Sequence, residues 1–163
     1  MKQWTGIEIK RARLELEDAS STILGCMIFE FSRLDCALGL MLVWANDGAD
    51  LEGLSKAVAG HTFHKKLLLL SEFALTKYKA NQETMSAYAD WLAEAHAVRG
   101  ERNCLIHGRW GTDPMRNQVV NVVGLPTGEQ VERRYTITQL KEVLVRMQRL
   151  QEQLSTLRTR WPV

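Results

Sequence analysis

The chain has 163 residues and a formal net charge of +2, and 45% of its residues are hydrophobic and 25% are charged. These values are ordinary for a globular domain and exclude a mostly disordered chain, a collagen-like repeat and a disulfide-rich scaffold. The length predicts a single domain over residues 1–163. The three cysteines include no closely spaced pair, which favours a reducing compartment and therefore a cytoplasmic location.

No part of the sequence suggests an exported protein or a membrane protein. The N-terminus carries no apolar region of the kind found in signal peptides. The longest apolar run, at 36–45, is shorter than the ~20 residues that cross a bilayer. We therefore expect no membrane partner.

Helical spacing predominates from the N-terminus onwards. Residues 4–18 have mixed polarity and predict a peripheral helix. From Ser20 to about Trp44, apolar side chains recur every three or four positions, which predicts a central helix with Ser20 or Ser21 as its cap. Turn-forming residues at 46–50 end this helix.

Two more helices are predicted in the middle of the chain, at 64–78 and at about 82–107. Asn81 is a suitable N-cap for the second of these, and Gly108 is a suitable stop signal after it. Gly100 lies inside the same helix at a cost of roughly 1 kcal/mol relative to alanine. Such a glycine suggests that another backbone approaches closely there.

Between residues 116 and 136 the apolar period changes from that of a helix to that of a strand, which predicts a β-hairpin of two short strands. A last helix begins near Thr136 or Thr138 and ends at about residue 160. Its apolar positions step by three and four, a pattern that suits a helical bundle or a helical dimer. We favour the bundle because other amphipathic helices are present. The predicted fold class is all-α, a helical bundle with a small β-hairpin insertion before the C-terminal helix.

The stretch 99–110 is the part of the sequence with the best candidates for catalytic residues. On a helix, Asn103 and His107 share one face and Arg102 lies beside them. His107 is at the expected helix C-terminus, where the helix dipole favours the imidazolium form. An arginine fork, an amide and a titratable imidazole together suit the binding of a phosphate group and proton transfer to it.

This stretch resembles the signature of the HEPN superfamily, whose members are helical bundles and often ribonucleases of toxin and phage-defence systems. The signature is an arginine, commonly followed by a polar residue, and then a histidine a few positions later. Here it reads Arg102-Asn103-Cys104-Leu105-Ile106-His107. The resemblance implies a HEPN-like homodimer that brings two such signatures into one cleft.

The resemblance also implies a reaction, which is metal-independent cleavage of single-stranded RNA by attack of the substrate's 2′-hydroxyl. It needs no cofactor. His107 would act in proton transfer, Arg102 would bind the phosphate, and Asn103 would orient the phosphate or the histidine. Asp35 is a candidate partner for Arg102. Any antitoxin or regulatory protein would be a separate chain.

Further RNA contacts are expected from basic and aromatic residues. Three of them flank the motif, and two lysines follow His64. These residues are Arg99, Arg109, Trp110, Lys65 and Lys66. Trp110 could stack on a base, although an aromatic residue where a helix meets a loop more often packs. Lysines at a helix end are by default solvated. His61 and His64 could offer two metal ligands, but no third ligand completes a site by spacing, so no metal is expected.

Other interpretations remain open. The same fold could be a catalytically inactive module that binds RNA, a nucleotide or a partner protein. The chain could also be a structural adaptor that assembles through its last helix. At the level of single residues, Arg102 and His107 could merely cap the helix and pair with acids. Trp44 and Trp91 fall on apolar helical faces and are predicted to lie in the core.

Overall fold

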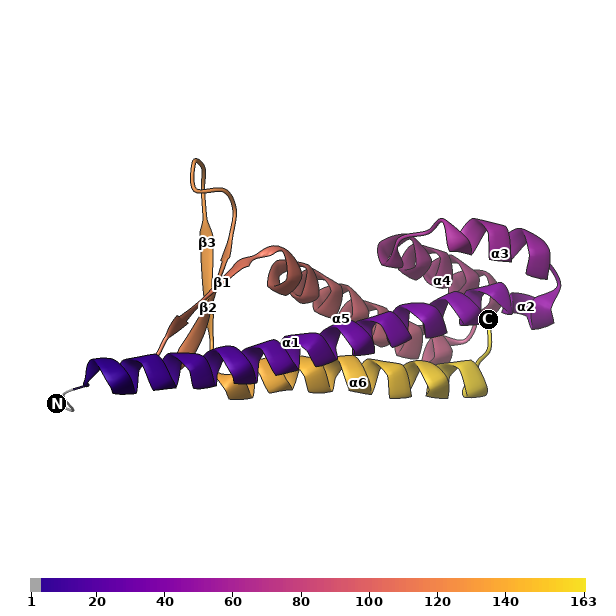
Figure 1. The fold of residues 1–163 in the computed structure, drawn as a ribbon. Helices are drawn as coiled ribbons and strands as arrows, with labels where there is room; N and C mark the ends of the chain where they lie inside the picture. Colours follow the sequence, from indigo (N-terminus) through magenta and orange to yellow (C-terminus); the bar gives the residue numbers. More distant parts are fainter. Residues whose placement is uncertain (1–3) are drawn as a thin grey trace. The chain divides into compact units, whose positions relative to one another are not determined.

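The structure, a computed structural model, describes residues 4–163, of which 73% are helical. A three-stranded antiparallel sheet precedes the final helix (Figure 1). The elements in chain order are α1 (Gly6–Val43), α2 (Ala45–Gly48), α3 (Leu51–Ala59), α4 (Phe63–Tyr78), α5 (Gln82–His107), β1 (Arg109–Asp113), β2 (Gln118–Val123), β3 (Val131–Tyr135) and α6 (Ile137–Arg160). The prediction of a mostly helical chain with a small β insertion before the last helix is confirmed.

The chain forms two compact units. The sheet unit consists of the described residues up to Phe29 together with Gly100–Val145, and the helical unit consists of Glu30–Arg99 together with Arg146–Val163. The sequence predicts a single domain. In the structure, three helices, α1, α5 and α6, each contribute residues to both units.

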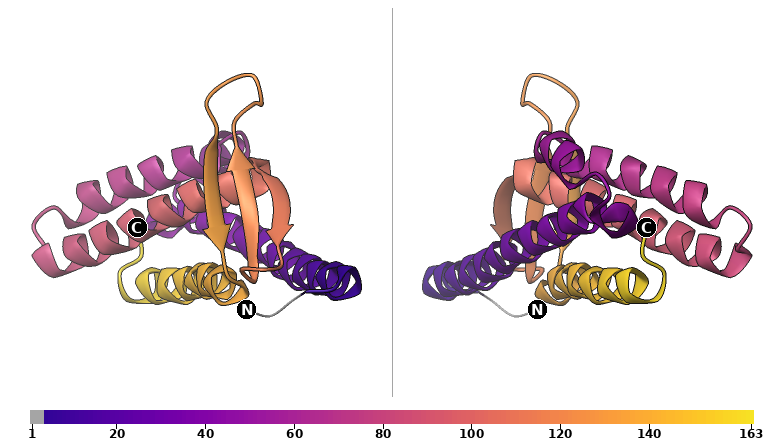
Figure 2. Two further views of the ribbon diagram at one scale, coloured as in Figure 1. Left: turned by 90° about the vertical axis from the view of Figure 1, so that its left-hand side faces the viewer. Right: turned by 90° about the vertical axis from the view of Figure 1, so that its right-hand side faces the viewer.

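The sheet contains one strand more than the predicted hairpin. The strand order is β1-β2-β3, and both pairings are antiparallel (Figure 2). Trp110 on β1 is paired with Asn121 on β2, which in turn is paired with Arg133 on β3. Because side chains of directly paired residues point to the same side of a sheet, these three side chains lie in a row on one face.

α1 is a single helix of 38 residues, so the predicted division near residue 19 is wrong. Ser20 lies inside the helix, and its hydroxyl donates a hydrogen bond to the Leu16 carbonyl oxygen at 2.7 Å. A serine that satisfies its hydroxyl on the preceding turn can stay in a helix interior instead of capping a new helix. No helix within residues 4–163 has the length and apolar character needed to cross a membrane.

The predicted turn after α1 is confirmed. Asn46 and Asp47 adopt left-handed backbone conformations, with φ values of 51° and 57°, which these two residue types tolerate better than most. α3, which follows, is not among the predicted helices. The side chain of its N-cap, Asp50, accepts a hydrogen bond from the Gly53 amide at 3.2 Å.

The later helices begin where their caps predict. Asn81 Oδ1 accepts a hydrogen bond from the Thr84 amide at 3.0 Å at the start of α5, as expected for an N-cap. α6 begins with a reciprocal pair of bonds. The Thr136 hydroxyl accepts from the Gln139 amide at 3.2 Å, and Gln139 Oε1 accepts from the Thr136 amide at 2.8 Å. This is a capping box, and it fixes the first turn of the last helix.

The apolar positions of α6 are buried within the chain, which supports the bundle interpretation over a helical dimer. The buried set, with exposed fractions of 0–6%, is Leu140, Val143, Met147, Leu150, Leu154 and Leu157. In the helical unit, α5 packs against this stripe, and the Trp91 indole N–H donates to the Leu150 carbonyl oxygen at 3.0 Å. Trp91 is a core residue as predicted, whereas Trp44 is 52% exposed and the prediction for it is wrong. Trp44 follows the last residue of α1, and its ring lies beside Gly48 in the turn.

Substitutions on opposite sides of α1 test the packing of the helical unit. Leu38 is fully buried and Leu40 is 49% exposed. We expect Leu38→Ala to lower the free energy of unfolding by about 2–5 kcal/mol, because it leaves a cavity in the core. Leu40→Ala should change it by less than about 0.5 kcal/mol. Urea unfolding followed by circular dichroism measures both, and equal effects would contradict the assigned orientation of α1.

Candidate functional site

The motif lies in the sheet unit, at the C-terminal end of α5. The helix ends at His107, where the Gly108 amide donates to the Cys104 carbonyl oxygen at 3.0 Å, and β1 begins one residue later. Gly108 ends the helix as predicted, but its backbone does not have a positive φ. A Cβ atom at this position would collide with the side-chain amide of Asn121. Packing therefore favours glycine at this position.

Asn121 is the residue that packs against the end of the helix. It is fully buried in the middle of β2. Neither its Nδ2 nor its Oδ1 atom forms a hydrogen bond with another of the described residues. A buried amide without partners is costly, since it gives up its hydrogen bonds to water. The amide group of this side chain occupies the space where a Cβ atom at position 108 would lie.

The three motif side chains differ in exposure. The His107 imidazole is exposed, and within residues 4–163 no hydrogen bond or ion pair involves it. Arg102 and Asn103 are half-buried, and Arg102 Nη1 donates to Asn103 Oδ1 at 3.2 Å. Asn103 and His107 lie one turn apart on the helix, about 40° from each other. The hydrogen bond therefore draws the guanidinium of Arg102 towards the face that carries His107.

Two residues of β3 join this region, and neither is among the sequence-predicted site residues. The pKa of Arg133 is raised, first by the negative charge that Cys104 carries when ionised and also by a hydrogen bond to Tyr135. Burial and the charge of Glu101 raise the pKa of Tyr135, and its bond with Arg133 lowers it in part. Both side chains thus lie near the last turns of α5. The alternation of positions 131, 133 and 135 in the predicted strand is the signal that could have indicated their common face.

Arg109 and Trp110 are neighbours on β1 and point to opposite sides of the sheet. The Trp110 indole N–H donates to the Leu105 carbonyl oxygen at 2.9 Å, and its ring is half-buried. This contact ties the first strand to α5, in agreement with the packing interpretation of Trp110. Arg109 is exposed and donates to Gln130 Oε1 at 2.9 Å. Its side chain thereby braces the loop between β2 and β3.

The remaining predicted RNA contacts belong to the helical unit. Lys66 is buried, and its Nζ atom lies 2.8 Å from Asp35 Oδ1. This ion pair corrects two expectations. Asp35 is paired with Lys66 instead of Arg102, and the buried ammonium group of Lys66 is not available for the predicted RNA contact. Lys65 is exposed on the first turn of α4. Arg99 is half-buried and is the last residue of the first of the two segments that form this unit.

The two histidines considered as metal ligands also lie in the helical unit. The ring of His64 meets that of His96 edge to face, with a centroid distance of 5.5 Å. Burial, together with the charges of Arg99 and His64, lowers the pKa of His96. No group of three or more His, Cys, Asp or Glu side chains among the described residues is arranged to hold a metal ion.

Comparisons of the chain with protein-family models, with curated proteins and with solved structures found no match. The function is therefore inferred from the geometry of the chain itself. At the end of α5, that geometry offers one exposed imidazole, one oriented guanidinium and a second guanidinium from β3. These groups can bind an anionic oxygen and exchange a proton with it.

The packing at the end of α5 can be tested by adding a single methyl group. We expect Gly108→Ala to lower the free energy of unfolding by about 1–3 kcal/mol, because the new Cβ collides with Asn121. In a protein that already carries Asn121→Ala, Gly108→Ala should lower the free energy of unfolding by less. A double-mutant cycle detects this non-additivity.

Gly100→Ala is the matched control on the same helix. Apart from its chain neighbours and the backbone of its own helix, no atom of residues 4–163 lies within 4 Å of a Cβ built at Gly100, so the close approach of another backbone expected there is not found among these residues. Alanine should stabilise the helix at this site by up to about 1 kcal/mol. A Gly108→Ala protein as stable as the unmodified one would contradict the proposed contact with Asn121.

Proposed function

We propose that the protein is a HEPN-like, metal-independent endoribonuclease that cleaves single-stranded RNA, of the toxin or phage-defence type. The observation that carries the proposal is the exposed imidazole of His107 at the end of α5, with the Arg102–Asn103 pair on the preceding turns. A histidine held by an internal ion pair could not exchange protons with a substrate, whereas this one faces solvent.

The reaction proceeds by intramolecular attack within the RNA. A base removes the proton of the 2′-hydroxyl, the 2′-oxygen attacks the adjacent phosphorus, and an acid donates a proton to the departing 5′-oxygen. The products are a 2′,3′-cyclic phosphate and a 5′-hydroxyl. Arg102 stabilises the charge that develops on the non-bridging oxygens, and His107 transfers a proton.

This reaction requires two proton-transfer groups, and the sheet unit contains a single histidine. The other three histidines in the sequence, His61, His64 and His96, belong to the helical unit. We therefore propose a homodimer in which the same histidine of a second copy completes the pair. A regulator such as an antitoxin would cover this composite cleft.

Arg133 extends the site as a second cation. It lies beside Cys104, which is three positions before His107 on α5. In the proposed nuclease it binds an RNA phosphate next to the one bound by Arg102. Its neighbour Arg134 points to the opposite face of the sheet and is paired with Asp113 at 2.8 Å and with Glu132 at 2.7 Å.

Cleavage of RNA in the presence of EDTA tests the proposal directly. The purified protein should produce fragments that end in a cyclic phosphate, and His107→Ala should reduce the rate by at least about 100-fold, since proton transfer by a side chain contributes about that much or more. His64→Ala, which removes an exposed histidine of the helical unit, should leave the rate unchanged.

Two results would contradict the nuclease proposal. If the unmodified protein binds RNA without cutting it, the chain is the catalytically inactive module. If light scattering shows a monomer under the conditions of cleavage, the composite cleft is wrong. Circular dichroism spectra of the two histidine variants must match that of the unmodified protein for the comparison to hold.

The salt dependence of RNA binding tests the role of Arg133. Removal of one phosphate contact should lower the slope of log affinity against log salt by about 1. We therefore expect a shallower slope for Arg133→Gln than for the unmodified protein. Arg134→Gln removes the same charge from the other face and should leave the slope unchanged. Equal slopes for the two variants would contradict the proposed contact between Arg133 and an RNA phosphate.

A further inference from the structure

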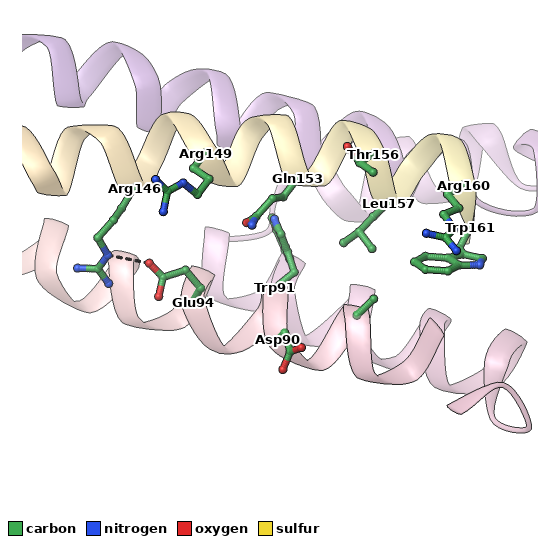
Figure 3. Close-up of a pocket in the computed structure, with 11 residues that line it drawn as sticks. Asp90, Trp91, Glu94, Arg146, Arg149, Gln153, Thr156, Leu157, Arg160 and Trp161 are labelled. Atoms are coloured by element: carbon green, nitrogen blue, oxygen red, sulfur yellow. Dashed lines mark hydrogen bonds and ion pairs between the residues drawn. The ribbon is translucent and has the colours of Figure 1, made fainter. Parts of the chain in front are cut away.

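The helical unit contains a cavity that the proposed nuclease does not use. It has a volume of about 490 Å³ and is open between α5 and α6 (Figure 3). This size is within the range of small-molecule binding sites. We call it the α5–α6 groove, and its main lining residues are Asp90, Trp91, Arg146, Arg149, Leu157 and Trp161.

One part of the groove is apolar, aromatic and fixed. Trp91 and Leu157 are 3% and 6% exposed, and the indole N–H of Trp91 is occupied by the Leu150 carbonyl oxygen. At the end of α6, the Arg160 guanidinium lies 4.2 Å from the centroid of the Trp161 ring. The Trp161 carbonyl oxygen accepts the Tyr88 hydroxyl at 2.6 Å, which anchors this end of the helix. These walls suit a flat ring that can pack against immobile side chains.

The charges in and around the groove are partly balanced. Arg146 pairs with Glu94 at 2.7 Å, and Arg160 pairs with Glu83 at the same distance. Arg149 is different, because it is exposed and within residues 4–163 forms no ion pair or hydrogen bond through its side chain. Figure 3 shows it on α6 near Arg146, away from Trp161. Its guanidinium is therefore available to bind an anionic group of a ligand.

The opposite wall offers one acceptor. Asp90 on α5 is exposed, and its carboxylate likewise has no ion pair or hydrogen bond with the described residues. Glu94 is neutralised by Arg146, so Asp90 is the carboxylate that disfavours a second anionic group on this wall. A ligand with a single acidic group and an N–H donor avoids this repulsion.

We infer that the α5–α6 groove binds a small heteroaromatic acid, a molecule with one flat ring system, an N–H donor and one acidic group. The ring packs between Trp91, Leu157 and Trp161. The acidic group takes the charge-assisted hydrogen bonds of the Arg149 fork, and the N–H donates to Asp90. Arg149 and Leu157 are separated by eight positions of α6, or about 12 Å. Because both side chains converge on the cavity, this spacing suits a molecule of mononucleotide length.

The acidic group can be a phosphate or a carboxylate, and two probes separate these sources. We would titrate the full-length protein with 5′-AMP and with indole-3-propionate by isothermal titration calorimetry. At least one probe should bind with a dissociation constant below about 1 mM. Binding of 5′-AMP alone assigns a phosphate ligand, and binding of indole-3-propionate alone assigns a carboxylate ligand.

Substitutions on α6 locate the binding site. Arg149→Gln should weaken binding about tenfold, as expected for the loss of one charge-assisted contact. Arg158→Gln is the matched control, because this exposed arginine of the same helix does not line the groove and its loss should leave affinity unchanged. His107→Ala should also bind the probe normally, so that failure of the nuclease proposal is distinguishable from failure of this one. The absence of binding by both probes, or equal losses in the two arginine variants, would overturn the inference.

Discussion

The close contact between Gly108 and Asn121 is the constraint on which the candidate site depends. It ends α5 at His107 and allows the chain to continue directly into β1. A bulkier residue at 108 would force the Asn121 side chain or the backbone around it to shift. The Trp110–Leu105 hydrogen bond fastens the same junction from the strand side. His107, the last residue of α5, is exposed beside this junction.

The electrostatics of this junction explain why arginines gather there. The C-terminal end of a helix carries a partial negative charge, which stabilises an imidazolium but repels a phosphate. A phosphate site at this end of α5 therefore needs cations that offset the helix dipole. Arg102 supplies one from the helix itself, and Arg133 supplies a second from β3. In the proposed nuclease, anion binding at this position would thus depend on the sheet as well as on the motif.

Local signals in the sequence are sufficient for the bounds of α5 and α6, but they miss α3 and are insufficient for the sheet. Asn81 and the apolar steps of α6 act within a few residues, so the bounds of α5 and α6 follow from them. β1 has no apolar alternation, and it becomes a strand because it pairs with β2. The register that places Arg133 near Cys104 arises from the same long-range pairing, and that is why the sequence motif includes only the α5 part of the site.

The position of Arg102 within α5 is consistent with the role proposed for it. The buried residues of this helix are spaced by three and four positions, and 102 falls on the same spacing between Val98 and Leu105. The stripe predicts an apolar side chain there, yet the residue is a half-buried arginine. A charged group at an inward-facing position breaks the local pattern, and such breaks occur chiefly where function requires them. The bond from Arg102 to Asn103 turns this charge towards the face of His107, which is the arrangement that the proposed phosphate chemistry needs.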